Sequence, residues 1–342
     1  MTGALVGVLN AVRAREMLMG RLRWFSALAV LGCAFVVAGS AGAEKPPAPP
    51  PSPGTPASGS GEQKDSLEAV PVSGDPSSGK AGASSAGTVG PAAPTGYTRV
   101  KSPDLSSPAG KQVHGKVVCP AGTVVWGGGV LFGSSDLAAS VNSSRPYQTT
   151  KGWEAWVNNG SADDTTFAVW AVCAKKPAGY AVVKHAVTNR KGEQTFGSAA
   201  CAGTKVELGG GVFSSSRNLS VNINSTYPGS AFQGFRGWVA YMNNASAANA
   251  KMTVYSICAK PVIPGYEVLL GPATANPDGG QTLASQVCTA GKVPVGGGIS
   301  SDSASLLVTL NSTAPSSDGW IGFENNASGA GTTMNALVIC VS

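Results

Sequence analysis

Six cysteines recur in pairs along the last 250 or so residues, and they are the side chains with the clearest chemistry in this sequence. The pairs are Cys119 and Cys173, Cys201 and Cys258, and Cys288 and Cys340. Six thiols allow fifteen pairings, and the repeat favours the one in which each segment closes on itself. Each bridge would close a loop of about 55 residues, which is worth roughly 4 kcal/mol in the chain-entropy model.

Catalytic and metal-binding chemistry finds little support in the other residues. The sequence has no Cys-x-x-Cys pair, and His114 and His185 do not hold equivalent positions in the repeats, so no zinc site is expected. No carboxylate recurs either, since Glu324 takes the place of Val157 and Met242. No nucleophile elbow or close carboxylate pair stands out. We therefore expect a protein without enzymatic activity, metal or cofactor.

Three further motifs recur between the paired cysteines. Each segment carries Gly-Gly-Gly, then Asn-Ser-(Ser/Thr)-x-Pro, then Gly-Trp and Asn-Asn. In the first segment, 8 residues lead from Cys119 to Gly127, 15 from Gly127 to Asn142, and 15 from Asn158 to Cys173, and both other segments keep these intervals. Fixed spacing predicts paired strands whose register tolerates no slip.

Each motif has a structural and a functional interpretation. The glycine triplet lacks the Lys-Ser/Thr of a phosphate loop, so we expect it to admit a bulky side chain or another strand, or to form a bulge. Trp153 and Trp156 should face opposite sides of one strand, one in the core and the other in a second core face or a platform for sugars. We expect the asparagines to form turns at strand ends, with polar binding or glycosylation at Asn142, Asn224 and Asn311 as alternatives.

The segments have the pattern of short strands separated by Gly, Pro, Asn and Ser. Residues 219–223 and 307–310 alternate apolar and polar side chains, and residues 153–158 and 167–173 are rich in β-branched and aromatic ones. No stretch combines a helical period with caps. The sequence predicts an all-β fold of three tandem repeats of about 80 residues, each a self-contained, disulfide-closed sandwich or barrel.

Composition divides the chain further. Residues 1–43 combine a basic stub, an apolar run and a small-residue cleavage site, which predicts an export signal, with lipidation at Cys33 or an uncleaved anchor as alternatives. Residues 44–95 are rich in Pro, Ala, Gly and Ser and are predicted to be a disordered linker. The β repeats follow at 96–178, 179–264 and 265–342. Their short links favour packing about a pseudo-threefold axis over an arrangement as beads in a row.

The net charge limits the possible partners, and the paired cysteines indicate the cellular compartment. The chain carries +6, which falls to +3 without the four Arg and one Glu of residues 1–43. This charge is too mild to indicate a nucleic acid or an anionic membrane as the partner. With the signal removed, no membrane span is expected. Paired cysteines behind an export signal predict a secreted or cell-wall-associated protein.

The order Cys, Gly-Gly-Gly, Asn-Ser, Pro, Gly-Trp, Asn-Asn, Cys resembles repeats of secreted or envelope-associated proteins from high-GC Gram-positive bacteria. The resemblance covers residues 96–342. It implies a place outside the cell but no particular activity. The third repeat departs from the pattern, because it ends Cys340-Val-Ser where the first two continue Cys-Ala-Lys.

The stretch between the Pro and the Gly-Trp changes length, with intervals of 6, 9 and 4 residues, and is predicted to form exposed hairpin tips. The tips carry the aromatic residues Tyr147, Phe232 and Phe235. Exposed aromatic rings suit the stacking of sugars, and three weak sites would gain by avidity on a polymer. We predict a non-catalytic protein that binds a cell-surface or extracellular glycan. The alternatives are a structural part of the envelope that contacts other proteins, and an inhibitor of an extracellular enzyme.

Overall fold

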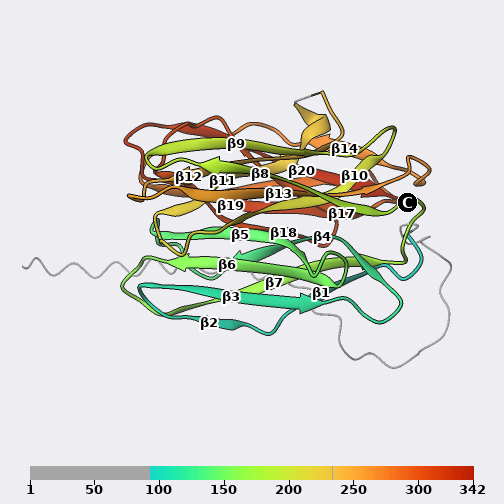
Figure 1. Ribbon diagram of the computed structural model, residues 1–342, viewed down its shortest axis with the longest axis horizontal. Helices are drawn as coiled ribbons and strands as arrows, with labels where there is room; N and C mark the ends of the chain where they lie inside the picture. Colours follow the sequence, from blue (N-terminus) through green and yellow to red (C-terminus); the bar gives the residue numbers. More distant parts are fainter. Residues whose placement is uncertain (1–92, 233) are drawn as a thin grey trace, which may run out of the picture. The chain divides into compact units, whose positions relative to one another are not determined.

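The computed structural model describes residues 93–232 and 234–342, which contain twenty β-strands, one short 3-10 turn and no α-helix (Figure 1). The all-β prediction is confirmed. Within these residues there is no helix long and apolar enough to span a membrane. The predicted signal and the predicted linker up to residue 92 lie outside the described residues.

Each repeat contributes a similar succession of strands. The first contains β1 (Thr98–Lys101), β2 (Leu105–Ser107), β3 (Lys111–Val118), β4 (Val124–Phe132), β5 (Ala139–Tyr147), β6 (Gly152–Asn159) and β7 (Thr165–Ala174). The second contains β8 (Ala181–Asn189), β9 (Glu193–Ala200), β10 (Val206–Ser214), β11 (Val221–Pro228), the turn η1 (Gly229–Ala231), β12 (Gly237–Asn244) and β13 (Ala250–Ala259). The third contains β14 (Glu267–Leu270), β15 (Thr274–Asn276), β16 (Gly280–Val287), β17 (Val293–Ser301), β18 (Val308–Pro315), β19 (Gly319–Asn326) and β20 (Thr332–Val341).

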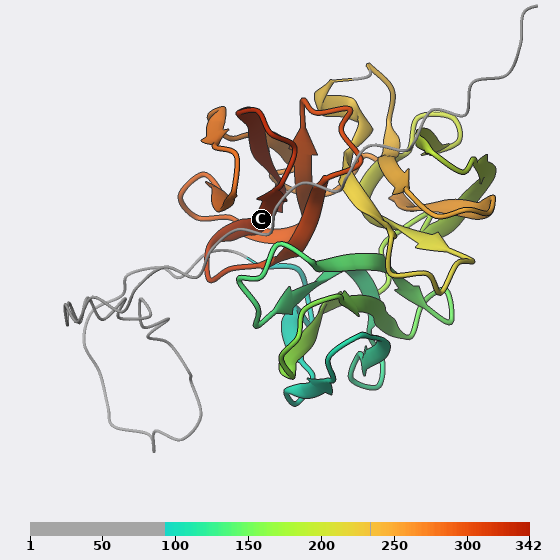
Figure 2. The same ribbon diagram turned by 90° about the vertical axis from the view of Figure 1, so that its left-hand side faces the viewer.

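The strands of each repeat divide between two sheets, and another repeat completes each sheet. Sheet A has the order β1-β7-β4-β18-β19-β16 with β2 beside β7, sheet B has β3-β6-β5-β10-β13-β8, and sheet C has β14-β20-β17-β11-β12-β9 with β15 beside β20. Figure 2 shows the three repeats as lobes around a common centre. The pseudo-threefold arrangement is therefore confirmed. The expectation of self-contained repeats is wrong, because no repeat holds a complete sheet.

The three disulfides pair as predicted: Cys119–Cys173, Cys201–Cys258 and Cys288–Cys340. The first cysteine of each pair follows β3, β9 or β16, and the second lies in β7, β13 or β20. Because these two strands belong to different sheets, the bridges join sheet A to B, B to C and C to A. Together they cross-link the three sheets in a closed ring.

The first glycine of each triplet lies where strands from different repeats approach at the centre. A Cβ on any of the three would fall on a backbone carbonyl oxygen in the glycine strand of another repeat. The pairs are Gly127 with Val295, Gly296 with Leu208, and Gly209 with Trp126. Only glycine permits so close an approach of two backbones.

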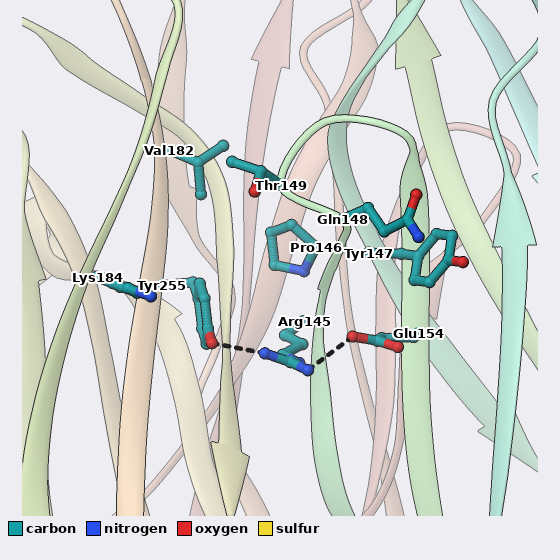
Figure 3. A pocket seen from close by; sticks show the side chains of 9 residues that line it. All are labelled: Arg145, Pro146, Tyr147, Gln148, Thr149, Glu154, Val182, Lys184 and Tyr255. Carbon is teal, nitrogen blue, oxygen red and sulfur yellow. Dashed lines mark hydrogen bonds and ion pairs between the residues drawn. The ribbon is translucent and has the colours of Figure 1, made fainter.

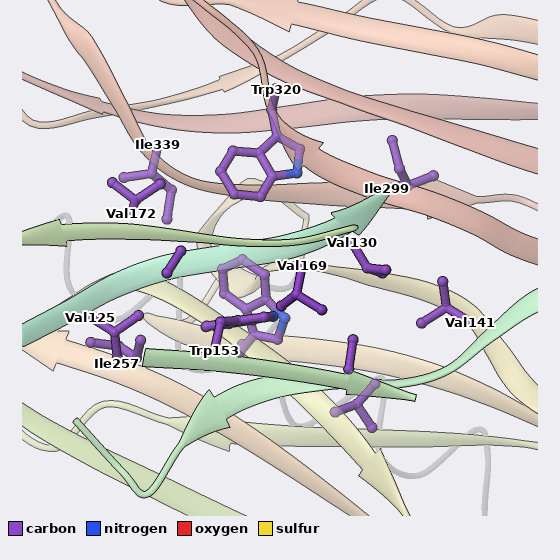
Figure 4. Close-up of a cluster of buried hydrophobic side chains, with 14 of the residues drawn as sticks. Val125, Val130, Val141, Trp153, Val169, Val172, Ile257, Ile299, Trp320 and Ile339 are labelled. Carbon is purple, nitrogen blue, oxygen red and sulfur yellow. The ribbon is translucent and has the colours of Figure 1, made fainter. Parts of the chain in front are cut away.

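The second glycine makes room for the repeated tryptophan. A Cβ on Gly128 would overlap the indole of Trp153, and the same relation recurs at Gly210 and Gly297. The indole N–H of Trp153 donates to Ser144 Oγ at 2.8 Å, so the tryptophan is buried with its polar group satisfied. Figure 4 shows Trp153 and Trp320 among buried Val and Ile side chains. The predictions of a close approach by a bulky side chain and of a core tryptophan are confirmed.

The repeated asparagines connect each repeat to the next. Asn142 lies in a bulge of β5, where the register shifts between Val141 and Ser143, so its side chain turns away from the ladder. Its Nδ2 donates to the carbonyl oxygen of Val221 at 2.7 Å, and Asn158 Nδ2 donates to the same oxygen at 2.9 Å. Asn224 and Asn243 converge likewise on Val308, and Asn311 and Asn325 on Ala139.

The prediction of turns at strand ends is therefore wrong for Asn142, Asn224 and Asn311. All three lie inside strands and are 1% exposed, so the folded chain does not present them as glycan acceptors. The turn prediction does hold for the second residue of the Asn-Asn pair, since Asn159 Oδ1 accepts from the backbone N–H of Ser161 at 3.2 Å.

The tyrosine that opens each repeat also joins two repeats. The hydroxyls of Tyr97, Tyr180 and Tyr266 donate to the carbonyl oxygens of Pro294, Val125 and Glu207. Burial raises the pKa of Tyr97 to about 12 and raises the pKa of the other two phenols as well. The recurring tyrosines and asparagines and the first glycine of each triplet thus contact another repeat, while the recurring tryptophans pack inside their own. These structural roles direct attention to the exposed residues that differ between the repeats.

Candidate functional site

The outer face of sheet B carries charged residues at the seam where β5 of the first repeat pairs with β10 of the second. Arg145 and Glu154 lie there. The equivalent positions hold Tyr227 and Val239 in the second repeat and Ala314 and Ile321 in the third. The three seams have the same strand arrangement. Only this one carries charged residues at these two positions, so it is the candidate site.

Arg145 is held at the centre of the seam by neighbours from both repeats. It pairs across the ladder with Glu154, and its Nη2 lies 2.9 Å from Glu154 Oε1. Its Nη1 donates to the hydroxyl of Tyr255 on β13 at 2.6 Å. The guanidinium also lies 4.3 Å from the ring centre of Phe213, 5.3 Å from that of Tyr255 and 5.5 Å from that of Trp156. Such cation–π contacts and a charged hydrogen bond fix the side chain.

His114 extends this cluster from the edge strand β3. Its Nε2 lies 3.1 Å from Glu154 Oε2, and its ring stacks on Trp156 with the centres 4.2 Å apart. Each carboxylate oxygen of Glu154 therefore has a partner. The prediction that His114 fills the same slot as Phe196 and Leu283 is confirmed, because each of the three pairs with the outer aromatic residue of its repeat.

A pocket of about 420 Å³ opens beside Arg145 (Figure 3). Tyr147 forms part of its wall, and Lys116 Nζ lies 3.3 Å from the Tyr147 hydroxyl and 4.8 Å from the ring centre. Gln148 and Thr149, in the hairpin tip, have φ values of 40° and 68°. Non-glycine residues adopt this conformation rarely, and it shapes the rim. The other lining residues are Pro146, Glu154, Val182, Lys184 and Tyr255.

Phe232 and Phe235 lie elsewhere, in the longer tip of the second repeat, which folds back over sheet C. Phe235 is half-buried against Tyr227 in a small apolar cluster with Val239 and Leu337. The expectation of an exposed ring is therefore wrong for Phe235. Phe232 is 45% exposed and meets Tyr227 edge to face, with the centres 5.5 Å apart.

A buried carboxylate holds this second tip in place. Glu207 Oε1 accepts hydrogen bonds from the backbone N–H and hydroxyl of Ser230, and Oε2 accepts from the Gly237 N–H at 3.1 Å. Burial raises the pKa of Glu207 above its usual value. The third tip, residues 316–318, is short and carries no aromatic side chain. The three tips are thus not equivalent, and the first borders the pocket of Figure 3.

Glu324 is a second unusual carboxyl, inside the third repeat. Its Oε1 accepts from Asn276 Nδ2 at 2.8 Å, while Oε2 has no hydrogen-bond partner among the described residues. Burial raises its pKa to about 7. The side chain has no exposed surface, so it bears on stability rather than on a site.

Sequence reasoning identified Tyr147 but missed Arg145, Glu154 and Tyr255. The sequence did point to Arg145 and Glu154, because the equivalent positions in the other two repeats hold uncharged residues. Nothing in the sequence pointed to Tyr255, because it belongs to another repeat and reaches the pocket only through the shared sheet. In the described part of the chain, no group of His, Cys, Asp and Glu is arranged to hold a metal ion.

Comparison with known proteins adds no functional assignment. No protein-family model matches the sequence, and no curated protein matches it. The resemblance to envelope-associated repeats therefore stays a prediction, and a function has to be argued from the seam pocket.

Proposed function

We propose that this chain is a non-catalytic protein of the cell exterior that binds a carbohydrate in the seam pocket of sheet B. The observation that carries the proposal is the pairing of two phenol rings, Tyr147 and Tyr255, with the fixed Arg145–Glu154 ion pair in one open pocket. Aromatic side chains offer apolar faces, and a few fixed polar groups orient a ligand. Three disulfides support an oxidising compartment outside the cytosol.

The contacts that fix the pocket side chains support binding. A hydrogen bond to Tyr255 and an ion pair with Glu154 hold Arg145 in place. Less side-chain freedom is then lost on binding, which favours affinity. Both oxygens of Glu154 have partners, Arg145 and His114, which suits a group that orients the pocket side chains.

We propose one principal site in place of the three similar sites that the repeats suggested. Phe235 is packed against Tyr227 and Val239, and the third tip carries no ring. Phe232 is the remaining exposed ring of the tips and offers at most a secondary contact. Avidity would then come from several protein molecules on one polymer rather than from the repeats of one chain.

Retention of the protein on cell-wall fractions and on a panel of immobilised glycans tests the proposal. Tyr147→Ala should weaken retention by up to about tenfold, since an aromatic contact is worth up to about 1.5 kcal/mol. Phe196→Ala is the matched control, because it removes an exposed ring from sheet C, away from the pocket. Lack of retention on any fraction or glycan, or equal losses in the two variants, would refute the proposal.

A protein partner is the second candidate, favoured by the outer face of sheet A. That face carries Ile321 and Phe323 on β19 and Leu283 on the edge strand β16, and Leu283 is 49% exposed. Exposed apolar side chains gathered on one face are typical of protein–protein contacts. Stable complexes on size exclusion together with no glycan retention would favour this candidate over carbohydrate binding.

A further inference from the structure

One end of the described body carries an excess of exposed positive charge. At this end, called the linker end, β3, β9 and β16 finish and the chain passes from one repeat to the next. Its exposed basic residues include Lys151, Lys175, Lys176, Arg236 and Lys260. Its acidic residues are few: Glu207 is buried, Glu267 is paired with Lys292, and Asp318 lies in the third tip. The linker end is therefore strongly basic.

The opposite end is mixed in charge. Lys111, Lys191 and Lys251 lie there, in or beside the turns that begin β3, β9 and β13. Asp163, Asp164 and Asp278 lie at the same end, and two of them accept backbone hydrogen bonds. Carboxylates therefore accompany the lysines at this end, and the mild net charge of the chain conceals the difference between its two ends.

A second pocket, of about 450 Å³, lies in the linker end. Its walls come from the segments that enter and join the repeats, residues 93–95, 175–178, 260 and 262–264, together with Ser342. Trp126 also lines it, at a position that holds Leu208 and Val295 in the other repeats. The Trp126 indole N–H has no acceptor among the described residues. We call this cavity the axis-end pocket, because all three repeats meet around it.

Lysines without counterions line the axis-end pocket. Lys175, Lys176 and Lys260 all contribute to it, and no Asp or Glu side chain of the described residues does. None of the three makes an ion pair with a described residue. Lysine is a point charge on a flexible stem, suited to anionic groups whose position varies along a polymer. The pocket therefore has the chemistry of an anion subsite.

The axis-end pocket and the seam pocket are neighbours along the chain. Ala178 lines the first, and Val182 and Lys184 line the second. Four residues of extended chain span at most about 14 Å, so Ala178 and Val182 lie within that distance. An oligosaccharide of a few sugar units has the length to span the distance between Ala178 and Val182.

We propose that the axis-end pocket is a second subsite, which takes the negatively charged groups of an extracellular polysaccharide that also occupies the seam pocket. Uronate carboxylates and phosphodiesters supply the required charge. The assignment rests on the proposed function for the carbohydrate nature of the partner, whereas the charge requirement comes from the lysines of the linker end.

Binding of the full chain to three polymers tests this assignment: alginate, which carries carboxylates, poly(glycerol phosphate), which carries phosphodiesters, and uncharged dextran. The test variant is Lys175→Gln/Lys176→Gln/Lys260→Gln. The control variant Lys111→Gln/Lys191→Gln/Lys251→Gln removes the same charge from the opposite end, where these lysines are also exposed.

The test variant should bind at least one anionic polymer about tenfold more weakly, at roughly twofold for each exposed ion pair lost, with a smaller response to added salt. The control variant should stay within about twofold of the parent protein. The polymer that shows the loss identifies the anionic group.

Three results would overturn the subsite. These are equal losses in both variants, no loss in the test variant, and binding to dextran without binding to either anionic polymer. The last result would leave the proposed function standing. Failure to bind any of the three polymers or any fraction of the glycan panel would end both proposals. Thermal unfolding of each variant confirms that the exposed substitutions leave the fold intact.

Discussion

Glu324 should make the protein less stable as the pH rises toward neutrality. Burial raises the pKa of this carboxyl from 4.5 to about 7, and the nearby Asp302 adds to the effect. Between these two values the folded protein keeps a proton that the unfolded chain has released. The contribution of Glu324 to the free energy of unfolding is then highest below pH 4.5 and falls until the pH passes about 7. At about 1.4 kcal/mol per pKa unit, the loss amounts to about 3 kcal/mol.

Glu324→Gln removes the titration while keeping an amide oxygen for Asn276 Nδ2 to bind. The cost of burying the new amide is the same at every pH, so the difference between variant and parent isolates the carboxyl. Urea unfolding at pH 4 to 8 should show the variant gaining about 3 kcal/mol relative to the parent across this range. Glu193→Gln, at the exposed start of β9, is the control and should change the curve little.

Parallel stability curves for the parent protein and Glu324→Gln between pH 4.5 and 7 would contradict this reasoning. They would mean that Glu324 is ionised in the folded protein, with an additional partner for its second oxygen. A parent that gains stability over the variant as the pH rises would have the same meaning.

Two further predictions concern the closure of the ring. Gly211→Ala places a Cβ on the carbonyl oxygen of Ser144 across the seam and should cost about 3 kcal/mol in urea unfolding; Gly331→Ala, in open space, should cost little, and equal effects would contradict the role of the triplet. Asn158→Ala removes the hydrogen bonds to the carbonyl groups of Leu219 and Val221 and should cost about 2 kcal/mol. The exposed Asn218→Ala should lower the thermal midpoint much less, and an equal drop would argue against the inter-repeat contact.

Several features could be predicted from spacing alone. The equal intervals around Cys119 and Cys173 predicted the disulfide pairing, and the changing interval after Pro146 predicted the hairpin tips. Both predictions needed only a comparison of the three repeats, because equivalent cysteines and equal or unequal intervals can be read from the sequence without knowing how the repeats pack. The candidate site was harder to predict from the sequence. Tyr147 could be named from its tip, but Arg145 could be placed in a pocket only once Tyr255 from the next repeat lay beside it.

The amino-acid sequence by itself determined the three β repeats, their disulfides and the glycines that allow close packing. The tertiary structure alone decided that the sheets are shared. Asn142 donates to Val221 of the second repeat, and a periodic sequence does not say whether its partner is in its own repeat or the next. Closing the ring selects the next repeat, because sharing leaves no sheet edge unpaired at the centre. The fold also brings the lysines of the connecting segments together at one end. The net charge of the chain gives no information about this placement.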